Sequence, residues 1–396
     1  MKKTLCLVLA LVLMLGCFAA CGSKSGTKDT SSTSATPATS AAATGAIKIG
    51  GTGPLTGGAA IYGNAAKNGA ELAVAEINAL GGLQFDLKYE DDTHDAEKAV
   101  NAYNALKDWG MQISLGSVTS KPCEATSAET FADRIFAITP SASSTSVTDG
   151  KDNMFQMCFS DPNQGTATAQ YINDKKMATK VAVIYKNDDV YSMGIYNTFT
   201  AKAKDLGLNI VSATTFTEDS QNDFSVQLTE AKKAGADLIF LPMYYTPASL
   251  ILKQAKSMDF APKFFGVDGM DGILTLENFD KTLAEGVMLL TPFNSDSTDA
   301  KTASFVKNFK AKYGDTPNQF AADGYDCVYA IYQACTAAKI TSETPTKDIC
   351  TAMIKQFTSM KFDGLTGTGT TWDTTGAVSK SPKGMVIKNG AYAGLD

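Results

Sequence analysis

The most constraining feature of this sequence is a regular alternation of short apolar segments with longer segments of helical periodicity, which begins at Ile47. Such alternation predicts parallel strands joined by helical crossovers. About ten strands are too many for one compact open sheet, so we expect an α/β fold with two lobes, each containing a doubly wound parallel sheet. The expected strands are 47–51, 85–89, 113–115, 135–138, 154–159, 180–185, 209–216, 238–242, 263–267 and 286–290. The expected helices between and after them include 64–80, 96–109, 122–134, 161–175, 191–206, 224–234, 247–258, 302–313, 321–338 and 346–357.

Two hydroxyl-rich loops follow neighbouring predicted strands in the first half of the chain. The loop 117–120 follows the strand 113–115, and the loop 139–144 follows the strand 135–138. In an open α/β sheet, ligands bind at the carboxyl ends of the strands, and hydroxyl and free N–H groups there suit a small anion such as a carboxylate. The same side chains would serve equally well to cap helices and turns, so this segment alone leaves both interpretations open.

The first residues have the features of a targeting signal. Two lysines precede an apolar run, 5–15, that is too short to span a bilayer, and small residues then precede Cys21. The pattern predicts a lipoprotein signal over 1–20 and lipidation of Cys21; Cys17 is a weaker candidate, and an ordinary secretory signal cut elsewhere is the alternative. The segment 21–45, rich in Ser, Thr and Ala, is expected to be a flexible tether, which would place the protein on the outer face of the cytoplasmic membrane, extracellular or periplasmic.

Composition argues against several classes of function. The net charge is −6, which does not support nucleic-acid binding. The single His, the absence of a GxSxG motif and a glycine-rich turn at 51–58 that misses the dinucleotide spacing argue against an enzyme with a nucleophile or a bound dinucleotide. The acidic loop 90–95 could suggest a metal, but a solvated loop that caps the next helix is the preferred interpretation, so no metal and no cofactor are expected.

Eight short segments, taken in order along the chain, resemble the periplasmic leucine/isoleucine/valine-binding protein family. They are Tyr62-Gly63, 75–82, 89–92, 116–120, 139–143, 191–194, 266–269 and 321–326. This resemblance covers the chain from Ile47 to about Gly390 and rests on the order and spacing of the segments. It implies the type I periplasmic-binding-protein fold, in which two α/β lobes are joined by three hinge crossovers and the ligand lies in the cleft. The implied first lobe is 46–161 with 292–375, and the implied second lobe is 162–291 with 376–396.

The resemblance also assigns binding residues by position. The implied ligand-binding residues are Tyr62, Ser120, Ser141, Ala142, Ser143, Tyr191, Tyr244 and Asp268. Ser120 and Ser143 would hold the α-carboxylate of an amino acid, while the Ser141 carbonyl and the Asp268 carboxylate would accept from its ammonium. We expect Asp268 to have no partner within its own chain; the alternative is that it only caps a turn.

Some positions depart from the family pattern. The positions of a first-lobe disulfide in well-known members are occupied here by His94 and Thr119, so that bridge cannot form. We expect His94 to have a structural role near the rim of the cleft. Five further cysteines lie beyond Cys21, and scattered buried thiols are the preferred interpretation, although a Cys335–Cys350 pair is geometrically conceivable.

The function implied by the resemblance is that of the substrate-binding protein of an ABC importer. Its partners would be a small amino acid, branched-chain by family default, the permease subunits and, through the lipid anchor, the membrane; a monomer is expected. Two alternatives stay open: a ligand sensor of the same fold acting on a signalling partner, and a binder of another amino acid or of a small amide.

Overall fold

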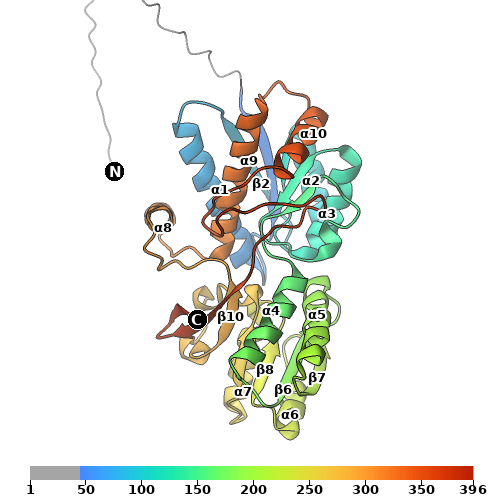
Figure 1. Ribbon diagram of the computed structural model, residues 1–396, viewed down its shortest axis with the longest axis vertical. Coiled ribbons are helices and arrows are strands. Elements are labelled where there is room, and N and C mark those ends of the chain that lie inside the picture. Colours follow the sequence, from blue (N-terminus) through green and yellow to red (C-terminus); the bar gives the residue numbers. More distant parts are fainter. Residues whose placement is uncertain (1–44, 396) are drawn as a thin grey trace, which may run out of the picture. The chain divides into compact units, whose positions relative to one another are not determined.

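The structure, a computed structural model, describes residues 45–395, so the predicted signal, Cys21 and nearly all of the tether lie outside the described residues. Two sheets organise this part of the chain (Figure 1). The strands are β1 (Ile47–Gly53), β2 (Phe85–Asp91), β3 (Ile113–Leu115), β4 (Phe136–Thr139), β5 (Met154–Gln156), β6 (Val181–Lys186), β7 (Ile210–Phe216), β8 (Leu238–Leu241), β9 (Lys263–Gly266), β10 (Met288–Thr291), β11 (Lys383–Lys388) and β12 (Ala391–Gly394). The helices are α1 (Ala60–Ala79), α2 (Ala96–Asp108), α3 (Ser120–Asp133), α4 (Asp161–Asp174), α5 (Val190–Leu206), α6 (Ser225–Ala234), α7 (Tyr245–Ser257), α8 (Ala300–Tyr313), α9 (Gln319–Ala338) and α10 (Thr346–Phe357).

The first lobe is built on a parallel sheet with the strand order β2-β1-β3-β4-β5. Helices α1 and α9 pack against each other beside this sheet, and α2 and α3 form a second pair (Figure 1). One apolar core joins the sheet to the helices of the C-terminal half, as in the contact of Phe136 with Phe357, whose ring centroids are 4.8 Å apart. The α8–α10 segment therefore completes a lobe whose sheet comes from the first 156 residues.

Glycine allows α1 and α9 to approach closely. A Cβ placed on Gly69 would lie 1.9 Å from the carbonyl oxygen of Ala321, and one on Gly324 would lie 2.2 Å from that of Ala66. Because backbone atoms cannot yield as a flexible side chain can, only glycine fits at these two crossing points.

The second lobe contains a sheet with the order β12-β11-β10-β9-β8-β6-β7. The sheet is parallel from β7 to β10, and β11 and β12 add antiparallel strands at its edge. Alternate residues of β6 belong to opposite faces: Val183 packs in the core that α4 and α5 cover, and Ile184 packs in the core that α6 and α7 cover. A strand buried on both faces explains why this segment is continuously apolar.

The chain passes between the two sheets three times, after β5, after β10 and before β11. Two buried polar contacts hold the last of these crossovers. The indole Nε1 of Trp372 donates to the carbonyl of Gln156 at 2.7 Å, and the ammonium of Lys380 pairs with the buried carboxylate of Asp323 at 3.1 Å. These contacts attach the last crossover to the end of β5 and to α9, both of which belong to the first lobe.

The expected two-lobe α/β fold is confirmed, and the differences concern element boundaries. Helix α1 begins four residues earlier than expected, at Ala60, and α3 begins at Ser120, two residues before the predicted Pro122. Strand β5 ends at Gln156, where the expected strand ran to 159, because the residues that follow form the first crossover. The strands β11 and β12 were missed. Strand β11 pairs with the distant β10, whereas β12 pairs with β11 across the two-residue turn Asn389-Gly390.

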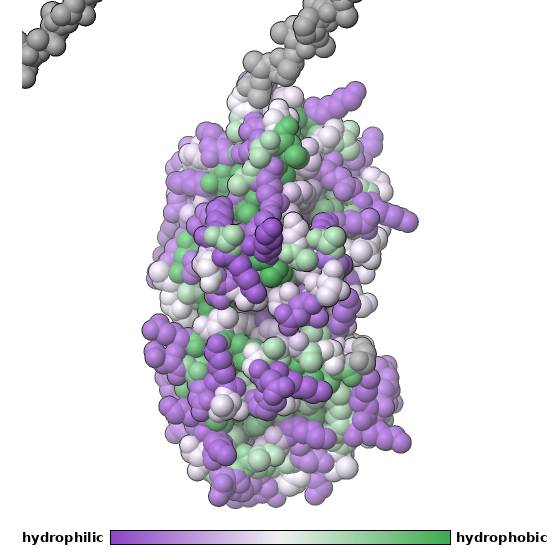
Figure 2. All heavy atoms as spheres, turned by 90° about the vertical axis from the view of Figure 1, so that its left-hand side faces the viewer, coloured by the Kyte–Doolittle hydropathy of each residue, from purple (hydrophilic) through white to green (hydrophobic). Residues whose placement is uncertain are grey.

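The surface drawn in Figure 2 is mainly hydrophilic, with hydrophobic residues in small groups. No helix in the described range 45–395 is both long and apolar enough to cross a bilayer.

Candidate ligand-binding site

Six of the eight residues assigned by the resemblance line one small cavity between the lobes. They are Tyr62, Ser120, Ser141, Tyr191, Tyr244 and Asp268. The remaining two, Ala142 and Ser143, are fully buried in the same loop as Ser141 and do not line the cavity. Val118, Thr119, Gly269 and Phe320 complete the lining, and these four were not predicted. Val118 and Phe320 are apolar core residues with no polar signature, so nothing in their local sequence marks them as site residues.

The two hydroxyl-rich loops are braced against each other at the edge of the first sheet. The Ser120 hydroxyl accepts from the backbone N–H of Ser144 at 3.2 Å. The Thr139 hydroxyl donates to the carbonyl of Ser117 at 2.8 Å and accepts from the N–H of Ala142 at 2.9 Å. No side chain caps the N-terminus of α3, so helix capping does not account for the hydroxyls of the first loop. The loops instead form a rigid floor of hydroxyl and N–H groups.

Tyrosines form the wall that faces these loops. The Tyr62 hydroxyl donates to the carbonyl of Gly269 at 2.6 Å and accepts from the N–H of Tyr245 at 3.0 Å, so one first-lobe side chain makes two hydrogen bonds to second-lobe backbone. Tyr191 and Tyr244 stack with ring centroids 4.7 Å apart and planes only 8° from parallel.

Asp268 lies at the start of a short 3-10 turn after β9 and is 3% exposed. Its carboxylate accepts from the Tyr191 hydroxyl at 2.6 Å, and its N–H donates to the amide oxygen of Gln164 at 3.1 Å. The expectation that Asp268 has no partner within the chain is therefore wrong. Its side chain does not cap the turn. Burial raises the pKa of Asp268 to about 7, although the Tyr191 hydrogen bond opposes this shift.

A second buried acid, Asp161, was not predicted. It does not line the cavity but lies beside the 139–144 loop, where its N–H donates to the carbonyl of Ser143 at 2.9 Å. It is 1% exposed, and neither of its carboxylate oxygens makes a hydrogen bond. Burial raises its pKa well above the usual range, the Ser143 hydroxyl beside it lowers the pKa, and the charge of Asp268 raises it. In the sequence, Asp161 followed by a proline at the start of α4 looks like an ordinary helix N-terminus, so nothing local distinguishes it from a capping residue.

The loop after β2 places the only histidine, His94, behind Thr119, which lines the cavity. Thr93 and His94 both have positive φ, 49° and 64°, and His94 Nδ1 lies 2.8 Å from the Thr119 hydroxyl. A hydrogen bond thus joins His94 and Thr119, the two positions that carry a disulfide in well-known members of the family. Burial lowers the pKa of His94 to about 4, so the ring is neutral at physiological pH. The expectation of a solvated acidic loop is wrong for Asp92, which is fully buried, whereas Asp95 caps α2 as expected.

The cysteines of the described residues are all buried and unpaired, which confirms the preferred interpretation of scattered thiols. They are Cys123, Cys158, Cys327, Cys335 and Cys350. The Cys335 thiol lies 3.7 Å from the sulfur of Met353 rather than in a bridge to Cys350.

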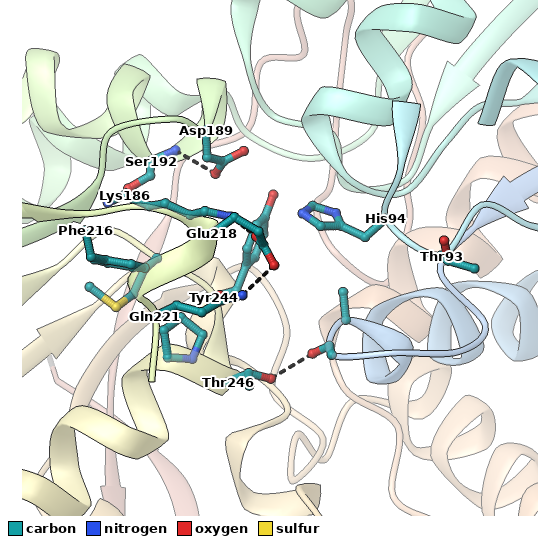
Figure 3. A pocket seen from close by; sticks show the side chains of 14 residues that line it. Thr93, His94, Lys186, Asp189, Ser192, Phe216, Glu218, Gln221, Tyr244 and Thr246 are labelled. Carbon is teal, nitrogen blue, oxygen red and sulfur yellow. Dashed lines mark hydrogen bonds and ion pairs between the residues drawn. The ribbon is translucent and has the colours of Figure 1, made fainter. Parts of the chain in front are cut away.

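The site cavity has a volume of only about 10 Å³. One water molecule needs about that much space, so an amino acid can bind only after side chains or lobes move apart. A larger cavity of about 140 Å³ adjoins it, and Tyr244 lines both (Figure 3).

Together these features define a class: a two-lobe α/β binding protein whose small-molecule site lies between the lobes at the carboxyl ends of the strands. A profile of the family described as periplasmic binding protein matches residues 46–391. The chain therefore belongs to the periplasmic binding protein family and, within it, to the leucine/isoleucine/valine-binding proteins.

Individual relatives agree with this assignment. The Leu/Ile/Val/Thr-binding protein of Salmonella typhimurium is 28% identical over 290 residues, which is 72% of this chain and 78% of that protein. The Leu/Ile/Val-binding protein homolog 3 of Brucella melitensis is 30% identical over 70% of this chain and 76% of its own length. Among solved structures, the branched-chain amino acid transporter substrate binding protein LivJ of Streptococcus pneumoniae, in complex with isoleucine, superimposes with a TM-score of 0.79 at 29% identity, covering 88% of this chain and 98% of that one.

Proposed function

We propose that this protein is the extracytoplasmic substrate-binding protein of an ABC importer and that it captures a small amino acid between its lobes. The observation that carries the proposal is the convergence of two opposite kinds of group on one buried site. Hydroxyl and N–H donors come from the first-lobe loops, and the buried carboxylate of Asp268 lines the same cavity. A second buried carboxylate, Asp161, lies behind the 139–144 loop next to Ser143. An α-amino acid carries the complementary pair, a carboxylate and an ammonium, and desolvated charged hydrogen bonds are strong.

In this proposal each end of the ligand has its own partners. The α-carboxylate accepts from the Ser120 hydroxyl and from N–H groups of the 139–144 loop. The ammonium donates to Asp268, to Asp161 and to the Ser141 carbonyl, and its charge offsets the desolvation that raises the pKa values of both acids.

The apolar part of the lining supports an aliphatic side chain. Val118 and Phe320 meet the Tyr62 ring, and Phe320 stacks edge-on to that ring at 4.6 Å. The names of the relatives indicate branched-chain amino acids. We therefore propose leucine, isoleucine or valine as the first ligands to test. We also propose that the protein binds its ligand without catalysing a reaction.

The relatives also favour delivery to permease subunits over a role in signalling, since one of them is described as a transporter substrate-binding protein. We further propose a monomer anchored by lipid at Cys21, with its lobes divided near 161, 291 and 376.

A thermal-shift screen of the twenty amino acids on the purified full-length protein tests the function. A ligand that binds only the folded state raises the free energy of unfolding, by about 2.7 kcal/mol at a ligand concentration of one hundred times Kd, and should therefore raise the melting temperature. At least one branched-chain amino acid should do so. If none of the twenty shifts the melting temperature at millimolar concentration, the proposed function is wrong.

The anchor is tested separately with Cys21→Ala. The variant should leave washed membranes and keep full amino-acid binding, because the tether 21–45 separates the anchor from the fold. Membrane retention of the variant would exclude lipidation at Cys21, and Cys17→Ala serves as the matched control.

A further inference from the structure

A second cavity lies beside the amino-acid site and is about fourteen times larger, 140 Å³ against 10 Å³. Tyr244 lines both cavities, and Thr119, which lines the small one, is hydrogen-bonded to His94, which lines the large one. In Figure 3, Thr93 and His94 face Lys186, Asp189 and Glu218 across the larger cavity. A ligand held at Asp268 would therefore meet this cavity if it extended past Tyr244.

Two buried oxygen atoms at this cavity, one from Asp189 and one from Tyr244, have no hydrogen-bond partner. Asp189 is 3% exposed; its Oδ2 accepts from the N–H of Ser192 at 3.2 Å, whereas its Oδ1 is buried and unpaired. The hydroxyl of Tyr244 is likewise buried and unpaired. Figure 3 shows the Tyr244 ring in the space between Asp189 and His94. Leaving a buried polar group unsatisfied is costly, so a partner for each is to be expected from whatever occupies the cavity.

The charged side chains around the cavity indicate which kind of chemical group fits there. The Lys186 ammonium is paired with Glu218 and lies 3.9 Å from Asp188. It also lowers the pKa of Asp189 against the raising effect of burial, which means that a cation already acts on this carboxylate. An anion would be repelled by Asp189 and Glu218. A cation would be attracted by these carboxylates, but it would have to compete with the Lys186 ammonium, which is already paired with Glu218. A neutral group that both donates and accepts hydrogen bonds fits best.

We propose that the larger cavity takes the carboxamide end of an amino-acid side chain, so that glutamine is a ligand in addition to the branched-chain amino acids. The amide N–H would donate to Asp189 Oδ1, and the amide carbonyl would accept from the Tyr244 hydroxyl. Because Tyr244 lines both cavities, we place the α-carbon groups of glutamine at the first site and its side-chain amide on the other side of Tyr244. This inference rests on the proposed function, because the α-carboxylate and ammonium are held by the residues named there.

Calorimetric titration of the full-length protein with L-glutamine, L-methionine and L-leucine tests it. Methionine has a side chain of similar length to that of glutamine but no amide. Comparing the two ligands therefore separates the effect of the amide hydrogen bonds from the effect of side-chain length. Wild type should bind glutamine at least tenfold more tightly than methionine. Asp189→Asn keeps an oxygen to cap Ser192 but loses the carboxylate, so it should weaken glutamine binding at least tenfold and leave leucine binding unchanged.

Asp299→Asn is the matched control, because Asp299 caps α8 through the N–H of Thr302 in the same way and lies outside both cavities. It should change neither affinity. Asp189→Ser provides a second variant if Asp189→Asn misfolds, because Ser is also a favourable N-cap residue, and it should also weaken glutamine selectively. The inference is overturned if leucine binds and glutamine does not, or if Asp189→Asn and Asp189→Ser affect both ligands equally. Failure of all three amino acids to bind would instead remove the proposed function and the inference with it.

Discussion

At the scale of single residues, Asp268 is the clearest link between burial and binding. Its carboxylate is buried beside Asp161, and the one cation that a neutral amino acid brings is its ammonium. Asp268→Asn preserves the shape and can keep the Tyr191 hydrogen bond, but it removes the charge. We expect it to weaken amino-acid binding by about 2–5 kcal/mol, as measured by calorimetric titration. Asp280→Asn, on an exposed loop far from the cavity, is the control and should have no effect; equal affinities of the Asp268 variant and wild type would contradict the ammonium role.

The same carboxylate should make the ligand-free protein sensitive to pH. The pKa of Asp268 is about 7 in the folded state and about 4 in an unfolded chain, so the folded state binds the proton more tightly. The free energy of unfolding should therefore fall as pH rises from about 4 to about 7, and it should be lower at pH 8 than at pH 5. Urea titrations of wild type and Asp268→Asn at these two pH values measure this. The variant should lose less stability than wild type over the interval; a larger loss in the variant would contradict the assignment.

At the scale of elements, the crossing of α1 and α9 depends on glycine. Gly324→Ala would place a methyl group 2.2 Å from the carbonyl oxygen of Ala66, so the helices must separate. Overpacking of this kind costs about 1–3 kcal/mol. The urea midpoint should fall accordingly with little change in slope. Gly82→Ala, where a Cβ meets nothing within 4 Å, is the control; an equal effect of the two substitutions would show that the helix crossing is not the cause.

At the scale of the whole molecule, ligand binding requires the lobes to change their contact. Tyr62 holds second-lobe backbone through two hydrogen bonds, and Thr246 donates to the carbonyl of Gly58 at 2.7 Å (Figure 3). Since a cavity of about 10 Å³ cannot hold an amino acid, these contacts must open to admit the ligand. We expect the ligand-free protein in solution to populate this open form, and the lobes to close on the ligand with the side chains around the cavity rearranged. The radius of gyration from small-angle scattering should fall when saturating leucine is added. Tyr62→Phe should have a larger ligand-free radius than wild type; identical radii in all samples would argue against hinge closure.

The alternation of apolar and helical segments determined the α/β class, the two lobes and nearly every element, because local periodicity reports which faces of a segment will be buried. The hydroxyl loops were also recognisable, since they follow neighbouring strands of one sheet whose carboxyl ends share an edge, whereas Asp268, in the other sheet, was assigned from the family resemblance. What surrounds each of these groups was decided only by tertiary structure. The Tyr191 partner of Asp268, the burial of Asp161 and the unpaired Asp189 depend on residues brought together from separate elements. Strand β11 was missed for the same reason, because its pairing with β10 is a contact across nearly a hundred residues that no local pattern encodes. The β11–β12 hairpin, in contrast, has a local signal in its turn, Asn389-Gly390, and was predictable from the sequence.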